Sequence, residues 1–150
     1  MANKKNCLGM LAIVLVFGMM VFGCVSNQSS FQRGNSVGGE TMILLRQGLD
    51  FDQAFREAVF VLSRHGFDPE MMQPEAGYIR TRWSGVSWYG GGNITRYRVR
   101  ILINFNPNRT QLIINAPAEY SNDNGRTWVV GYDTRAIATL RTDLTQSIGN

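Results

Sequence analysis

The pattern of apolar and polar positions predicts two helices and a series of strands between residues 40 and 150. An apolar residue recurs every three or four positions over Phe51–Leu62, which is the spacing of one helix face. Asp50 precedes this stretch and Gln53 follows three positions later, as in a capping box. A second stripe, preceded by a capping Asp133, predicts a closing helix; its members are Ile137, Leu140, Leu144 and Ile148.

Alternation of apolar and polar residues predicts the strands, most clearly over 96–105. Other strands are expected at 41–46, 67–73, 78–83, 111–120 and 127–130. The stretch 85–93, with the sequence GVSWYGGGN, is expected to be a glycine-rich loop. This order of strand, helix, strand meander and helix predicts an α+β fold, in which two helices pack on one face of an antiparallel sheet.

The first 24 residues have the order of a secretory signal. Asn3-Lys4-Lys5 supplies a basic start, an apolar run follows over 8–22, and Gly23-Cys24 closes it. The ending resembles a bacterial lipobox, in which cleavage falls before the cysteine and its sulfur receives a diacylglycerol group. Residues 1–23 are therefore predicted to be a signal peptide, and Cys24 is the predicted lipidation site. An uncleaved spanning helix is the alternative, since a span needs about 20 apolar residues.

Three segments are expected in the chain: the signal peptide at 1–23, a lipidated cysteine with a flexible tether at 24–39, and one domain at 40–150. The tether is rich in Ser, Asn, Gln and Gly, which leaves little to bury. Cys7 leaves with the signal and the lipid occupies Cys24, so no thiol remains for a disulfide, a metal or catalysis. The expected location is the bacterial cell envelope. The outer membrane is favoured because Val25 follows the cysteine, where an inner-membrane retention signal would have Asp.

All basic residues that remain after export are arginines. The net charge falls from +4 to +2, because only Lys4 and Lys5 are lost and no acidic residue is. Five arginines are expected on the outer face of the sheet, since Ile79, Thr81, Trp83 and their counterparts on the next strand should face the core. These five are Arg80, Arg82, Arg96, Arg98 and Arg100.

Two interpretations of this arginine face stay open. It is either a solvated surface or a binding surface for phosphorylated lipid, a polyanionic glycan or an acidic protein patch. Glu119 is expected across from Arg96, where it would offset one charge. Trp88 and Tyr89 on the glycine-rich loop are candidate partner contacts. Nucleic acid is not an expected partner, because the domain is exported and its net charge is small.

Other chemistry has little support in the sequence. His65 is the only histidine and lies in the last turn of the first helix, where a structural or solvated role is expected. No zinc-ligand spacing, nucleophile motif or cofactor-binding motif is present, so no catalytic residue, metal or cofactor is predicted. Trp83, Trp128 and Phe105 would either fill the core or line a pocket between the sheet and the closing helix.

Several short stretches carry a resemblance to a family. These are Phe51-Asp52-Gln53-Ala54-Phe55, His65-Gly66-Phe67, Gly77 to Trp83, Arg96 to Arg100 and Tyr132-Asp133. Over 40–149 the chain resembles the helix-grip domains of the lipoprotein C subunit of the outer-membrane β-barrel assembly machine. The resemblance implies a helix-grip fold and a role in binding an envelope partner, as an accessory of outer-membrane assembly. The alternative function is a carrier of a small apolar ligand or lipid. That family has no catalytic residues to transfer.

Overall fold

The computed structural model describes residues 30–34, 39–90 and 93–150. The predicted signal peptide at 1–23 and the predicted lipidation site at Cys24 lie outside the described residues. The elements, in chain order, are β1 (Phe31–Arg33), β2 (Glu40–Leu44), α2 (Phe51–Arg64), β3 (Pro69–Gln73), β4 (Tyr78–Thr81), β5 (Ser84–Gly90), β6 (Asn93–Val99), β7 (Leu102–Phe105), β8 (Gln111–Asn115), β9 (Pro117–Ser121), β10 (Val129–Asp133) and α3 (Thr134–Ile148).

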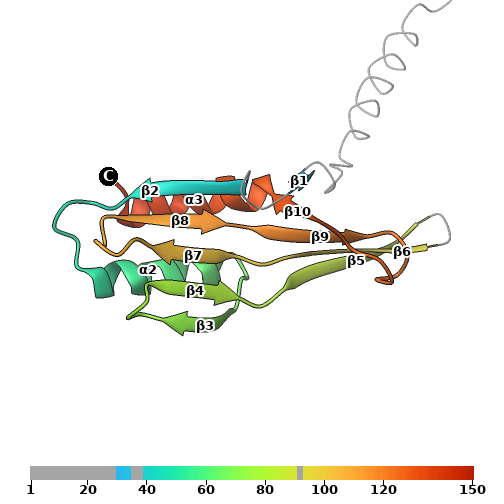
Figure 1. Cartoon of the computed structure of the whole chain (residues 1–150), viewed down its shortest axis with the longest axis horizontal. Helices are drawn as coiled ribbons and strands as arrows, with labels where there is room; N and C mark the ends of the chain where they lie inside the picture. Colours follow the sequence, from blue (N-terminus) through green and yellow to red (C-terminus); the bar gives the residue numbers. More distant parts are fainter. Residues whose placement is uncertain (1–29, 35–38, 91–92) are drawn as a thin grey trace, which may run out of the picture.

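The predicted α+β class is confirmed, but the strands form two antiparallel sheets where one was expected. One sheet has the order β1-β10-β9-β6-β5 and the other β2-β8-β7-β4-β3. The two sheets are end-to-end parts of the same long hairpins, because β4 continues into β5, β6 into β7, and β8 into β9 (Figure 1). Main-chain hydrogen bonds continue between the two sheets, as from the Arg100 amide to the Pro117 carbonyl at 3.1 Å.

A bulge at the junction of β4 and β5 divides the long hairpin. Arg80 lies opposite Leu102, whereas Ser84 lies opposite Val99. The first strand advances four residues, from 80 to 84, while its partner advances three, from 102 to 99. The first strand therefore contains one extra residue, which defines a β-bulge. The extra residue reverses the faces of all side chains that follow it, because the strand period is two.

Both helices pack on one face of the β2-β8-β7-β4-β3 sheet, as predicted (Figure 1). Asp50 caps α2 by accepting a hydrogen bond from the Gln53 amide at 3.1 Å, and Asp133 caps α3 by accepting one from the Ala136 amide at 2.8 Å. The core between these layers contains Phe55, Leu62, Ile79, Ile103, Phe105, Leu112, Ile114, Leu140, Leu144 and Ile148. Phe105 is thus a core residue, with Phe51 and Phe55 packed on its ring.

The flexible tether predicted at 24–39 was wrong for Phe31–Arg33. These residues form β1 and pair antiparallel with β10, where Phe31 lies opposite Asp133. The Phe31 ring packs on the rings of Tyr97 and Tyr120, at centroid distances of 6.2 and 6.1 Å. This one aromatic residue in a polar stretch provides the apolar contact that holds the strand. Residues 24–29 and 35–38 lie outside the described part.

The glycine-rich loop predicted at 85–93 was also wrong. Residues Ser84–Gly90 form β5, which pairs with β6 over seven residue pairs, from Ser84 opposite Val99 to Gly90 opposite Asn93. Trp88 and Tyr89, the candidate loop contacts, therefore lie in a strand, and their side chains are outside the described part. Glycine has a low strand propensity, but pairing along β6 outweighs it here.

Candidate functional site

The central feature of the candidate site is an arginine that contacts two tryptophan rings on the sheet face that the helices leave open. The guanidinium carbon of Arg98 lies 4.8 Å from the Trp83 ring centroid and 4.1 Å from that of Trp128. Its Nε donates a hydrogen bond to Glu119 Oε2 at 2.6 Å, and its Nη2 forms an ion pair with the same oxygen. Stacking and a carboxylate together fix this side chain in one orientation.

Arg100 extends the stack along the same strand face. Its guanidinium carbon lies 4.6 Å from the Trp83 ring centroid, on which Arg98 also stacks. The Arg100 Nε is buried and has no hydrogen-bond partner among the described residues. A buried donor without a partner costs about 1–3 kcal/mol, which the stacking contact has to offset.

The other three predicted arginines differ in their partners. Arg80 forms an ion pair with Glu70 at 3.3 Å and lies on the other sheet, opposite Leu102. Arg82 and Arg96 are exposed and have no ion pair among the described residues. The structure therefore brings Arg98 and Arg100 onto the tryptophan rings and places Arg96 beside Gly125, next to Trp128, whereas Arg80 is engaged by Glu70. We call Trp83, Trp128, Arg96, Arg98 and Arg100, together with the exposed Arg82 that precedes Trp83 in the chain, the Arg–Trp surface.

Two expectations about this surface were wrong. Trp83 and Trp128 were expected in the core or beside a pocket under the closing helix, yet both stack on Arg98 on the open face. The bulge at the end of β4 explains the position of Trp83, because it reverses the side-chain alternation. Glu119 lies opposite Arg98, two residues from the expected Arg96, which faces Ser121. Glu119 therefore neutralises the stacked arginine and leaves Arg96 exposed.

A second polar cluster lies on the helix side of the sheet, at the start of α3. Tyr97 Oη donates a hydrogen bond to Asp133 Oδ2, while Asp133 Oδ1 caps the helix. Asp133 is only 6% exposed. Burial, the hydrogen bond to Asp133 and its negative charge raise the pKa of Tyr97 well above the ordinary value of 10.0. Sequence patterns gave no sign of this pair, because its residues are 36 positions apart.

Two hollows open beside this cluster. One, of about 190 Å³, is lined by β5 and β6 residues together with Ser30, Asp133 and Arg135. The other, of about 220 Å³, lies between the end of α2 and the start of α3, with His65, Phe67 and Leu140 in its wall. Both are smaller than the sites of about 300–1,000 Å³ that usually hold small molecules. Neither is lined by Trp83 or Trp128.

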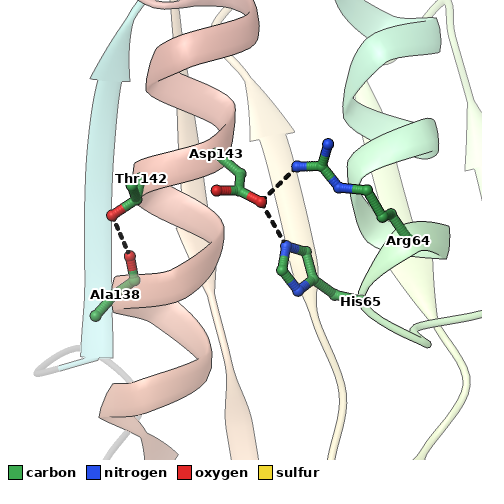
Figure 2. A network of polar contacts seen from close by, with 5 residues as sticks. All are labelled: Arg64, His65, Ala138, Thr142 and Asp143. Atoms are coloured by element: carbon green, nitrogen blue, oxygen red, sulfur yellow. Dashed lines mark hydrogen bonds and ion pairs between the residues drawn. The ribbon is translucent and has the colours of Figure 1, made fainter.

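A third cluster ties the two helices together. Asp143 on α3 accepts a hydrogen bond from Arg64 Nη2 at 2.5 Å and lies 2.7 Å from His65 Nε2 (Figure 2). These contacts, first that of His65 and then that of Arg64, lower the pKa of Asp143 from its ordinary value of 3.8. His65 at the C-cap of α2 thus has the structural contact expected of it.

Among residues 30–34, 39–90 and 93–150, no group of three His, Cys, Asp or Glu side chains could hold a metal ion. No helix of the described part combines the length and the hydrophobicity needed to cross a membrane. Comparison with models of known protein families finds no match, and comparison with curated proteins finds none either.

Proposed function

We propose that this chain is a lipid-anchored protein of the bacterial cell envelope that acts by binding an anionic partner and is not an enzyme. The order of basic start, apolar run and Gly23-Cys24 supports the anchor. Two or three acyl chains give stable attachment, at about 0.8 kcal/mol for each buried CH₂ group. The resemblance to helix-grip domains supports a role as an accessory of outer-membrane assembly.

The observation that carries this proposal is the contact of Arg98 with both Trp83 and Trp128. The two rings and the Glu119 carboxylate hold the centre of the surface in place, so this chain loses little side-chain entropy when a partner docks there. Trp and Arg are also the residues most enriched at the centres of protein interfaces.

The charges of the Arg–Trp surface specify the partner. Glu119 neutralises Arg98, while Arg82 and Arg96 have no carboxylate among the described residues. Exposed guanidinium groups pair with carboxylates through two parallel hydrogen bonds, which gives both direction and strength. An acidic segment of another envelope protein therefore fits this surface best.

Crosslinking in intact envelopes tests the proposal. The tagged full-length lipoprotein is crosslinked in its native cells, and the captured proteins are compared between wild type and the Arg82→Gln, Arg96→Gln double variant. The matched control changes two exposed helix arginines, Arg56→Gln and Arg141→Gln. We expect one partner to be lost in the first variant and kept in the control. Equal capture by both variants would contradict the proposed surface.

A second candidate function is the carrier of a small apolar ligand in the two hollows beside α3. Each hollow alone is smaller than a usual ligand site, but the two adjoin, since Val99, Asp133 and Arg135 line both. Native mass spectrometry of the lipoprotein purified from its own cells tests this candidate. A bound lipid or small molecule that is displaced by Val99→Trp would support it, and a mass equal to that of the lipidated chain would contradict it.

A further inference from the structure

The edge strand β5 (Ser84–Gly90) leaves half of its main-chain groups without a partner strand. It ends the sheet β1-β10-β9-β6-β5, and β6 is its one neighbour among the described strands. An edge of this kind is a template for another strand. We infer that β5 binds an extended acidic segment of the partner protein as an additional strand. This inference rests on the proposed function and specifies the form of the partner.

The hydrogen-bond pattern identifies the residues that would pair with the added strand. The amide of Arg100, which directly follows β6, donates a hydrogen bond to the Pro117 carbonyl, which belongs to β9. In β6, the even-numbered residues therefore direct their main-chain groups toward β9, and the odd-numbered residues direct theirs toward β5. Val86 lies opposite the odd-numbered Tyr97, so the main-chain groups of Val86 form hydrogen bonds with β6. The main-chain groups on the open edge belong to Gly85, Ser87 and Tyr89.

The other three edges carry features that block strand addition, whereas β5 carries none within its own seven residues, since the bulge lies before it. β1 has three residues and includes Arg33, and β3 begins with Pro69 followed by Glu70. The edge of β2 contains Glu40, and its last residue accepts a hydrogen bond from the Asn150 amide at 3.1 Å. The sequence of β5, SGVSWYG, contains no charge and no proline over seven residues. It is the unprotected edge of the described sheets.

A hollow next to β5 would receive one side chain of the added strand. Ser84, Gly85 and Val86 form its wall on β5, and its volume is about 190 Å³. Val86 is 52% exposed there, so an apolar side chain of the partner would cover it. Specificity in strand addition comes from such pockets for alternate side chains, while the main chain supplies affinity.

The surrounding charges favour an acidic partner segment. Arg82 precedes β5, Arg96 lies opposite Ser87 on β6, and Arg135 lines the hollow. Asp133 also lines the hollow, but both of its oxygens already accept hydrogen bonds, one from Tyr97 and one from the Ala136 amide. Asp133 is buried, whereas Arg82, Arg96 and Arg135 are exposed, so the accessible charges beside β5 are positive.

Amide exchange of the full lipoprotein in detergent micelles tests the inference directly. The probes are two blocked ten-residue peptides with the same alternating Val-Thr centre, one with two Glu at each end and one with two Lys. With the Glu peptide at saturation, exchange at Gly85 and Ser87 should slow at least tenfold, while exchange at Val86 stays unchanged. The Lys peptide should bind at least tenfold more weakly. No slowing at Gly85 and Ser87 would overturn the inference.

A matched pair of variants tests the same edge. Ser87→Pro removes an outward amide and is compatible with an edge strand, whereas Ser87→Thr keeps that amide. We expect the Ser87→Pro variant to bind the Glu peptide at least tenfold more weakly, with an unchanged thermal midpoint. The Ser87→Thr variant should bind the peptide like wild type. Equal binding by both variants would overturn the inference. If the Ser87→Pro variant does not fold, the amide-exchange measurement on the wild-type protein is the test of the inference.

Two other occupants of β5 would also be visible. Amide protection at Gly85 and Ser87 without peptide would show that β5 is already covered. Protection that increases with protein concentration would indicate a second copy of the chain, and protection independent of concentration would indicate another segment of the same chain. Either result would overturn the partner-strand inference. The proposed function stands apart from these outcomes, since its binding role is tested by whether the Arg82→Gln, Arg96→Gln variant loses the crosslinked partner.

Discussion

The guanidinium carbon of Arg98 lies 4.1 Å from the centroid of the Trp128 ring. This contact joins β6 to the residue just before β10, across a gap of 30 positions in the sequence. Because the same guanidinium group also contacts the Trp83 ring, at 4.8 Å from its centroid, Arg98 connects three separate segments on the open face of the sheet. The stack is therefore both a structural contact and the fixed centre of the proposed binding surface.

Truncation of Arg98 should destabilise the domain. Arg98→Ala removes two cation–π contacts and leaves Glu119 without its partner, so we expect a loss of about 1–3 kcal/mol in the free energy of unfolding. Arg98→Lys should recover less than half of this loss, because an ammonium group cannot stack and pair at once. Denaturant unfolding measures both values. Arg96→Gln, on the same strand, is the control and should stay within about 0.5 kcal/mol of wild type.

A substitution at Gly131 should detach β1. A Cβ at this position would overlap the Gln32 carbonyl and the Phe31 ring, both of which belong to β1. Gly131→Ala should therefore expose the chain after Arg33 to trypsin at least tenfold faster, since cleavage follows local opening. Mass spectrometry of the cleavage products measures the rate. The control is Val130→Ala on the same strand, where the side chain is 59% exposed. Equal rates in the two variants would show that β1 does not pack as described.

The Tyr97–Asp133 pair should make stability fall at alkaline pH. The folded pKa of Tyr97 is raised above its unfolded value of about 10, so its contribution is complete below pH 10 and is lost as the pH rises further. At pH 8, Tyr97→Phe should be less stable than wild type by about 1 kcal/mol. This difference should shrink between about pH 10 and 12. A difference that stays constant over this range would contradict the raised pKa; Tyr78→Phe is the control.

Asp143 should give the opposite pH dependence. Its folded pKa is lowered from 3.8, so its contribution to stability is complete above about pH 4 and is lost as the pH falls through the folded pKa. Asp143→Asn should lower the thermal midpoint at pH 7, and its midpoint should approach that of wild type near pH 2. Asp68→Asn, an exposed carboxylate without an ion pair among the described residues, should match wild type throughout. A constant gap between Asp143→Asn and wild type would show that the carboxylate does not act through its charge.

Local signals in the sequence were sufficient for the helices. Asp50 and Asp133 cap the two helices where the capping patterns predicted them, and the apolar stripes face the core. These signals act over three or four residues, so they depend little on the rest of the fold. The fold class could be predicted as well, because the order of helices and strands follows from these local signals.

Features that depend on long-range pairing could not be predicted in this way. One extra residue between Arg80 and Ser84 placed Trp83 on the opposite face from the expected one, and alternation alone cannot reveal such a bulge. The pairing of Phe31 with β10 joins residues about a hundred positions apart. The polar composition around Phe31 predicted a flexible tether and not a strand. The grouping of Arg96, Arg98 and Arg100 on one face was predicted, but the two tryptophans beside them and the partner of Glu119 were not.

Fatty-acid labelling of the protein in its native cells tests the central claim most directly. The claim is that acylation of Cys24 anchors the domain to the envelope. Wild type and Cys24→Ser are grown with a radioactive fatty acid, purified and compared. We expect label on wild type alone, with a mature chain that begins at Cys24 and sediments with the membranes. Unlabelled wild type that retains Met1 and stays in the soluble fraction would contradict the claim.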